Sequence, residues 1–344
     1  MSDAFPDPIL TANLYCAGRL NEAVFGAVRP AWRAFQEAAP ERLWYLWFMR
    51  YGKGGEHLKI RLHGPAPGKD LLAGLLTDAA GAFFAAVEPP AAAPPPGRWA
   101  NAPPLDAQDR VSADHPDRTL LWTDYARSPV SLGGEPFLGD DVYAARMTAC
   151  LARAAEIVLE ALTPDHDGAF PHGRRQSTLL GGLVAALAAL GFTAEQRSSY
   201  LRYHRDSLLR FLLIKSEEPV AAADAVLAQF NGRVAAMATS FQTVQARTAE
   251  RWRHGPSARS AGELETAWCQ SLVRLHAHIA PLVSDPGHHL DPFAPDPAFS
   301  PLFKALHGLA NALGIGLWDE ALAHHLLLLV ADPESSRRVV LLPE

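Results

Sequence analysis

Four basic or protonatable side chains occupy alternate positions near residue 60, in the stretch HLKIRLH. They are His57, Lys59, Arg61 and His63. Because alternate residues of a strand point to opposite faces, a strand here would gather all four on one face. Such a face could hold an anion or a polarised carbonyl group inside a cleft. The open alternative is that the basic face simply meets water.

A second group of polar side chains follows helical spacing. Residues 198–213 place Tyr200, His204 and Ser207 on one helix face, which could line a cleft. Equally, the helix could pack through its leucines and turn these groups outward. Farther along, His307 is a candidate proton carrier because imidazole titrates near neutrality. A buried helix histidine with satisfied hydrogen bonds is the alternative.

The sequence gives little support for metal or nucleotide chemistry. The chain has 14 histidines, but pairs such as His324 and His325 are adjacent and cannot both face one ion from a regular helix. There is no H-E-x-x-H pattern, no cysteine pair, no G-x-G-x-x-G after a strand and no G-x-S-x-G. We therefore expect neither a metal nor a cofactor.

Composition narrows the class of protein further. The 344 residues carry a formal net charge of −6, which argues against non-specific nucleic-acid binding. The three cysteines are far apart and predict no disulfide framework. The N-terminus lacks signal-peptide character, and no apolar run approaches the ~18 residues of a membrane helix. A cytoplasmic protein with no membrane segment is expected.

The N-terminal part is predicted to form an antiparallel sheet with helices. The apolar run before the basic stretch is predicted to be a central strand, joined to it by a Gly-rich hairpin. The element order β-α-β-β-α is typical of an α+β fold. Expected strands cover residues 10–16, 43–51, 57–63 and 119–125; expected helices cover 20–39, interrupted near Pro30, and 70–87.

From about residue 140 the chain is predicted to be largely helical. Helical periodicity covers residues 142–162, 177–190, 194–215, 220–245, 263–283, 300–313 and 318–330. The tail, residues 337–344, could add an edge strand. We expect one catalytic domain over residues 1–344, with a sheet-containing part (1–140) and a mainly helical part (141–344).

Three segments resemble a known family. Residues 28–35, VRPAWRAF, followed by residues 43–64, LWYLWFMRYGKGGEHLKIRLHG, resemble the signature of the lantibiotic-dehydratase C-terminal, or glutamate-elimination, domain family. Residues 302–327 resemble its L-x-H-x-x-x-N-R-L-G segment with a downstream glutamate, which places His307, Asn311 and Glu320 at family positions. The resemblance spans about residues 11–330 and implies an elimination-domain-like α+β fold.

One loop departs from the family pattern. Glutamate-eliminating members resemble Y-x-P-E-x-x-R-Y-G-G, whereas residues 125–134 here are YARSPVSLGG. Ser128 stands where the catalytic glutamate would be, and Ser131 replaces the arginine. Elimination needs a base for the α-proton and a cation for the leaving carboxylate. The sequence is therefore more similar to the stand-alone pyridine synthases of thiopeptide biosynthesis.

That resemblance implies a formal (4+2) aza-cycloaddition between two dehydroalanines of a precursor peptide, with loss of water and leader peptide to close a macrocycle. The implied partner is a leader-bearing, azole-containing dehydrated peptide, together with other thiopeptide biosynthetic enzymes. The expected catalytic residues are Lys59, Arg61, His307, Tyr125 and Tyr200. The expected substrate-binding residues are His57, His63, His204, Ser207, Asn311, Glu320, Arg202 and Trp122.

An acidic leader peptide could contact the arginine pairs Arg202/Arg205 and Arg251/Arg253. Two other functions stay open. One is a glutamate-eliminating lyase of a split dehydratase system, and the other is a non-catalytic scaffold that presents precursor peptides. The scaffold would tolerate replacement of Lys59, Arg61 and His307.

Overall fold

The chain forms two compact units, Met1–Pro171 and His172–Glu344. The structure, a computed structural model, describes residues 9–41, 44–51, 56–88, 115–123, 140–162, 172–213, 216–254, 262–283, 291 and 293–340. Within these ranges, no helix is both long and apolar enough to cross a bilayer. The expectation of one catalytic domain is not tested by the division into units and stays a prediction.

The first unit is built on a four-stranded antiparallel sheet in the order β2-β3-β1-β4. The strands are β1 (Ile9–Tyr15), β2 (Tyr45–Tyr51), β3 (His57–His63) and β4 (Thr119–Thr123). The predicted α+β class and the β2–β3 hairpin pairing are confirmed. The prediction of a central β2 is wrong: among the described strands, β2 lies at the edge and β3 is flanked on both sides.

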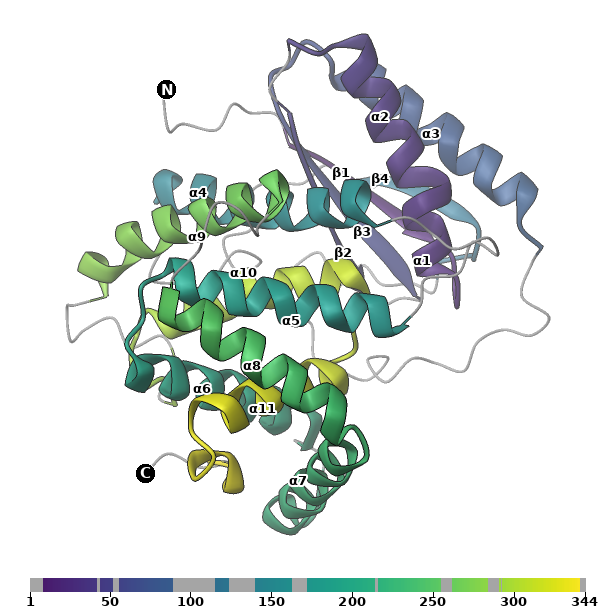
Figure 1. The fold of residues 1–344 in the computed structure, drawn as a ribbon. Helices are drawn as coiled ribbons and strands as arrows, with labels where there is room; N and C mark the ends of the chain where they lie inside the picture. The colour runs from purple at the N-terminus through teal and green to yellow at the C-terminus, as the bar shows by residue number, and fades with distance from the viewer. Residues whose placement is uncertain are drawn as a thin grey trace. The chain divides into compact units, whose positions relative to one another are not determined.

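One face of the sheet is apolar and packs against helices. Leu58, Ile60 and Leu62 are fully buried, and α2 and α3 cover this face (Figure 1). The helices of this layer are α1 (Leu20–Ala23), the π-helical turn η1 (Val24–Val28), α2 (Arg29–Ala38) and α3 (Lys69–Ala86). Pro30 lies in the first turn of α2, where its missing N–H is tolerated. The interruption predicted near Pro30 is thus a π-turn.

Helix α4 (Asp141–Glu156), which continues into η5 (Ile157–Ala161), packs on β2. The Asp140 side chain caps it by accepting a hydrogen bond from the Tyr143 backbone N–H at 2.9 Å. The first helix after residue 140 therefore belongs to the unit that contains the sheet.

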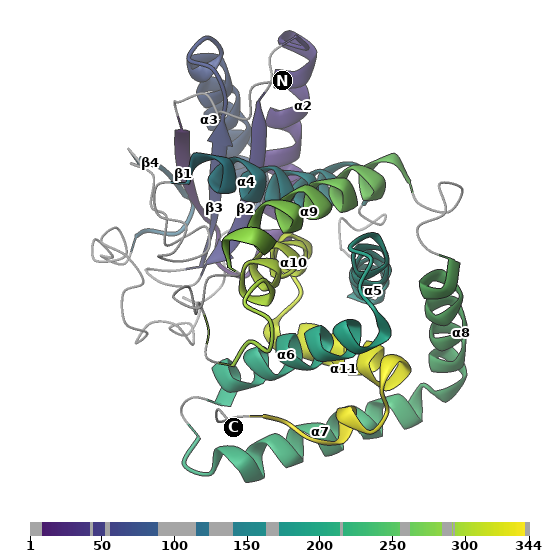
Figure 2. The same ribbon diagram turned by 90° about the vertical axis from the view of Figure 1, so that its left-hand side faces the viewer.

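The second unit is helical. Its elements are α5 (His172–Ala189), α6 (Ala194–Leu213), α7 (Pro219–Ala236), α8 (Ala238–His254), α9 (Glu263–Leu282), α10 (Phe299–Leu313), α11 (Leu317–Ala331) and η6 (Ser335–Arg337). The single helix predicted over residues 220–245 is in fact two, α7 and α8, which separate at Met237. Helices α6 and α11 pack along each other (Figure 2).

The core of this unit forms where α6, α7 and α11 meet. Phe230 and Leu209 are fully buried there, beside Leu322 and Ala321. On another side, α5 approaches α10 closely at Gly182, where an added Cβ would lie 2.7 Å from Leu309. Because α6 packs along α11 and α10 contacts α6, side chains of the three helices can meet at one point.

Candidate active site

Three helices of the second unit bring their polar residues together. Tyr200 and His204 lie one turn apart on α6, and both are fully buried. Glu320, one turn into α11, is fully buried as well, and α10 contributes His307. Residues four apart share a helix face, so α6 presents its two groups on the side that packs against α11. The alternative in which α6 turns Tyr200 and His204 outward is therefore wrong.

A continuous hydrogen-bonded chain links these side chains. The Tyr200 hydroxyl donates to His204 Nδ1 at 2.9 Å, and His204 Nε2 donates to Glu320 Oε1 at 3.0 Å. His307 Nδ1 donates to the other carboxylate oxygen, Oε2, at 2.8 Å. Because an ionised carboxylate only accepts, the chain fixes the proton of His204 on Nε2. Both oxygens of Glu320 are thus occupied by histidines.

The charges in this chain are set by competition between burial and pairing. Burial alone would raise the pKa of Glu320, but the charge of His307 and the hydrogen bonds from both histidines hold it well below its ordinary value. Burial alone would lower the pKa of His307, but the charge and hydrogen bond of Glu320 raise it. Burial lowers the pKa of His204. The hydrogen-bonded residues thus pair the buried carboxylate of Glu320 with His307, which readily takes up a proton.

Among the four hydrogen-bonded residues, His307 is the one whose side chain reaches the solvent. Its side chain keeps 29% of its surface exposed, whereas those of His204 and Glu320 keep 0%. Nδ1 is held by Glu320, and Nε2 forms no hydrogen bond with the described residues. A carboxylate that orients one ring nitrogen leaves the other available for proton transfer, so the arrangement suits a general base or acid. Glu320, which an amphipathic helix could have left in water, is buried.

A metal centre is the competing interpretation of the same residues. Donor atoms of His204, Glu320 and His324 lie within 4.8 Å of one another. However, the rings of His204 and His324 stack with centroids 3.8 Å apart and planes 25° apart. An ion must lie near the plane of each ring that binds it, and nearly parallel stacked rings do not share such a point. The geometry favours the hydrogen-bonded chain, and the absence of a metal stays a prediction.

In the first unit, the basic face of β3 does not meet water. Lys59 is 8% exposed and Arg61 2%, so the solvent-facing alternative is wrong. The Lys59 ammonium lies 5.1 Å from the centroid of the Tyr51 ring, and the Arg61 guanidinium 5.6 Å from that of Trp47. Cations over aromatic faces are stabilised by the ring quadrupole. The two predicted cations thus lie against aromatic rings of the neighbouring strand β2.

The two flanking histidines, His57 and His63, also contact aromatic side chains. His57 packs against Tyr15 and Tyr51, with ring centroids 4.6 and 5.4 Å away. The Trp47 indole N–H donates to His63 Nε2 at 3.3 Å. All four residues singled out by their alternation therefore share one buried, aromatic-lined face, as the strand pattern predicts.

Other predicted site residues lie elsewhere. Trp122 pairs with Ala12, so it lies on the opposite face from Lys59 and donates to Thr77 of α3 at 3.3 Å. Ser207 on α6 accepts a hydrogen bond from Arg210 at 2.7 Å.

Asn311, Arg202 and Tyr125 are the remaining predicted site residues. Asn311 follows His307 by one turn on α10, and Arg202 is partly buried on α6. Tyr125 lies outside the described residues, as do Ser128 and Ser131.

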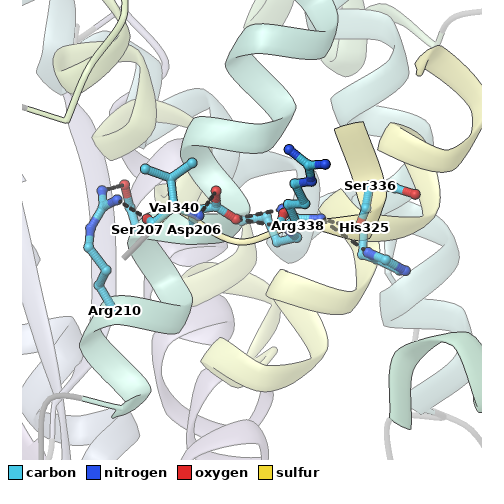
Figure 3. A network of polar contacts seen from close by, with 8 residues as sticks. Asp206, Ser207, Arg210, His325, Ser336, Arg338 and Val340 are labelled. Carbon is cyan, nitrogen blue, oxygen red and sulfur yellow. Dashed lines mark hydrogen bonds and ion pairs between the residues drawn. The ribbon is translucent and has the colours of Figure 1, made fainter. Parts of the chain in front are cut away.

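Arg205 does not form a surface patch with Arg202. It is fully buried and pairs with Asp206, and its guanidinium donates to the backbone oxygens of Ser336 and Arg338 (Figure 3). Asp206 Oδ2 accepts from the backbone N–H of Val340 at 3.0 Å. The described end of the tail, residues 338–340, is thus held by side chains and forms no strand.

The sequence carries one sign of a buried polar contact at this point of α6. Arg205 and Asp206 are adjacent charges within a helix that is otherwise packed by leucines, and adjacent helix positions cannot both face solvent as freely as an i,i+4 pair. As expected for adjacent helix residues, His324 and His325 face different partners: His324 Nδ1 hydrogen-bonds to the Glu320 backbone oxygen at 2.9 Å, and His325 Nε2 to Asn231 at 3.1 Å.

A family model described as "Lantibiotic biosynthesis dehydratase C-term" matches residues 10–330. The chain is similar in structure to the pyridine synthase TbtD from thiomuracin biosynthesis, with a TM-score of 0.63 and 19% identity over 96% of this chain and 99% of that one. It is also similar to TsrL, with a TM-score of 0.58 and 13% identity over 97% and 99%. A comparison with curated proteins gives no match.

Proposed function

Because the chain belongs to the lantibiotic biosynthesis dehydratase C-terminal family, we propose that it is a pyridine synthase of thiopeptide biosynthesis. Its substrate is a leader-bearing, azole-containing peptide with two dehydroalanines. Its reaction is a formal (4+2) aza-cycloaddition, after which water and the leader peptide leave and a macrocyclic pyridine remains. The fold shared with a pyridine synthase supports this proposal, and so does the replacement of the eliminase Glu and Arg by Ser128 and Ser131.

The observation that carries the proposal is the His307–Glu320 pair. One amide beside a dehydroalanine must lose its N–H proton and gain a proton on oxygen to become the azadiene. His307 Nε2 takes the nitrogen proton, since Glu320 holds the other side of the ring and stabilises the imidazolium that forms. Tyr200 acts at a distance: it is a positioning residue that fixes the tautomer of His204.

Lys59 and Arg61 take the role of carbonyl and hydroxyl binders. Each is a cation on a buried face, where a hydrogen bond to an oxygen that gains charge is stronger than in water. Closing a macrocycle is chiefly an entropic problem, and correct positioning of two reacting groups can supply about 7–11 kcal/mol. The enzyme acts in the cytoplasm, needs no cofactor, and receives its peptide from the enzymes that install azoles and dehydroalanines.

Mass spectrometry tests the proposal directly. The protein is incubated with a leader-bearing, azole-containing peptide that carries two dehydroalanines. We expect release of the intact leader as a C-terminal amide and a core lighter by the leader and one water. His307→Gln should lower kcat by about 10²–10⁴-fold, the usual value of a general base, whereas exposed His254→Gln should leave it unchanged.

Two outcomes would overturn the proposal. Conversion of a glutamylated-serine peptide to dehydroalanine, without pyridine formation, would assign the chain to the glutamate-eliminating lyases. Tight peptide binding with neither reaction, unchanged in Lys59→Ala, Arg61→Ala and His307→Gln, would assign it to the scaffolds.

A further inference from the structure

Helix α10 leaves one stripe of its surface less than fully buried. Most of its residues are buried, but those at steps of three and four from Ser300 are only partly so. The stripe consists of Ser300, Phe303, Lys304, His307, Gly308 and Asn311. It is therefore the face of α10 on which the open edge of His307 lies.

Lys304 is the cation of this stripe, and none of the described residues pairs with it. No hydrogen bond or ion pair joins its ammonium to them, in contrast to Arg205 and Arg251, which pair with Asp206 and Glu265. Partly buried charges are normally paired, because removing a charge from water is costly. Burial lowers the pKa of Lys304, and no acid within the described part of the chain raises it again.

The carboxylate of the site, Glu320, is already occupied. Both oxygens of Glu320 accept from histidines, so neither offers Lys304 a free acceptor. Residues three apart on a helix are neighbours, with Cβ atoms about 5–6 Å apart. Lys304 and His307 are therefore neighbours on one face of α10, close enough for both to contact one substrate group.

We propose that Lys304 is a further catalytic residue, which binds the oxygen of the substrate amide while His307 takes the proton from its nitrogen. This inference rests on the proposed function. As the N–H bond breaks, its electron pair forms the C=N bond and the C=O electrons move to oxygen. Lys304 donates a proton to that oxygen, and the proton on His307 returns to Lys304 through solvent. Atoms and charge balance, and no cofactor enters.

Turnover of matched variants tests the role. Lys304→Met should lower kcat by about 100-fold or more, the value of one donor to a developing oxyanion, and Lys304→Arg, which keeps the charge, should retain more activity. Lys69→Met, at the start of α3, is the control and should retain parental kcat. The urea midpoint of Lys304→Met should equal or exceed that of the parent, because an unpaired, partly buried charge is removed. A merely structural lysine would give the reverse: lower stability with residual activity in proportion to folded protein.

A binding measurement separates this inference from the proposed function. Limited acetylation, followed by peptide mapping, should modify Lys304 more slowly when the dehydrated peptide is bound, with Lys69 unaffected. If the parent forms pyridine and Lys304→Met stays within twofold of it, Lys304 has no catalytic role while the proposed function stands. If the parent forms no pyridine, the proposed function fails; protection of Lys304 would then still support its contact with the peptide, and lack of protection would overturn that too.

Discussion

Glu320 stays ionised without any contact with solvent. A buried carboxylate is ordinarily neutral, because burial penalises its charged form. Here two histidines donate to its two oxygens, and one of them, His307, takes up the compensating proton. The pair behaves as one unit: the carboxylate makes the imidazole more basic, and the imidazolium keeps the carboxylate charged.

We predict that Glu320→Gln uncouples this unit. The neutral amide no longer favours imidazolium, so burial dominates and the pKa of His307 falls from above its ordinary value to below it. NMR titration of the His307 ring checks the direction. The acidic limb of a kcat profile should move to lower pH, and kcat should fall by about 10²-fold.

The control for this variant is Asp319→Asn on the neighbouring residue. Asp319 lies 3.6 Å from His172, whose side chain is 49% exposed, and it does not contact His307. Its loss should leave the His307 titration where it was. Equal shifts in both variants would mean that the general negative field, and not the Glu320 contact, sets the basicity of His307.

Helix α6 carries two unrelated polar systems on adjacent residues. His204 faces Glu320. The next residue, Arg205, turns to the tail and donates to the backbone oxygens of Ser336 and Arg338, while Asp206 accepts from the Val340 backbone N–H. Burial raises the pKa of Asp206, although Arg205 opposes this. The contacts with the tail thus further stabilise the position of α6, the helix that carries Tyr200 and His204.

Removing one partner of the buried pair should be costly. Asp206→Asn leaves the Arg205 charge buried without its counter-charge, which typically destabilises by about 3–5 kcal/mol. The matched control is Arg337→Met, which breaks the Arg337–Glu334 pair on the same tail, where the side chains are 69% and 77% exposed. It should cost no more than about 1 kcal/mol. Urea unfolding compares them, and similar losses would deny the Asp206 pair any special role.

Two adjacent glycines of α5 give a test of how closely the helices pack. A Cβ at Gly182 would lie 2.7 Å from Leu309 and 3.3 Å from Trp268, whereas one at Gly181 meets nothing within 4 Å. Gly182→Ala should therefore destabilise by about 1–3 kcal/mol through overpacking. Gly181→Ala should stabilise by about 0.5–1 kcal/mol through helix propensity. Opposite signs in urea unfolding are expected; stabilisation by both would mean that α10 has room to move.

Across the whole molecule, what the sequence predicts depends on the separation of the residues concerned. Alternation places His57, Lys59, Arg61 and His63 on one strand face, and helical periodicity locates most helices, because both patterns are local. Whether the basic face is covered depends on distant chain segments, so the sequence leaves its burial open. His204 meets Glu320 across 116 residues, and no spacing rule links them. Family positions supplied His307 and Glu320, which helical periodicity alone would have left on solvated surface.

The second unit as a whole should lose stability on mild acidification. Burial lowers the pKa of four of its described histidines, His204, His276, His324 and His325, the last two to about 3 and about 4. Below pH 6.5 the unfolded chain binds protons at these sites and the folded chain does not, so unfolding is favoured as pH falls. His307, whose pKa is raised, acts in the opposite sense: its stabilisation is complete below pH 6.5 and is lost as pH rises through its folded pKa.

The four histidines with lowered pKa values affect stability more than the one histidine with a raised pKa. From pH 6.5 to 5, His324 alone should cost about 2 kcal/mol, and the net loss should be about 2–4 kcal/mol. Urea unfolding at pH 7.5, 6.5, 5.5 and 5 measures it. His325→Asn should flatten the dependence, because a group that charges only in the unfolded chain is removed, while exposed His254→Gln should not. A flat profile in the parent would mean that water reaches these imidazoles and lets them protonate in place.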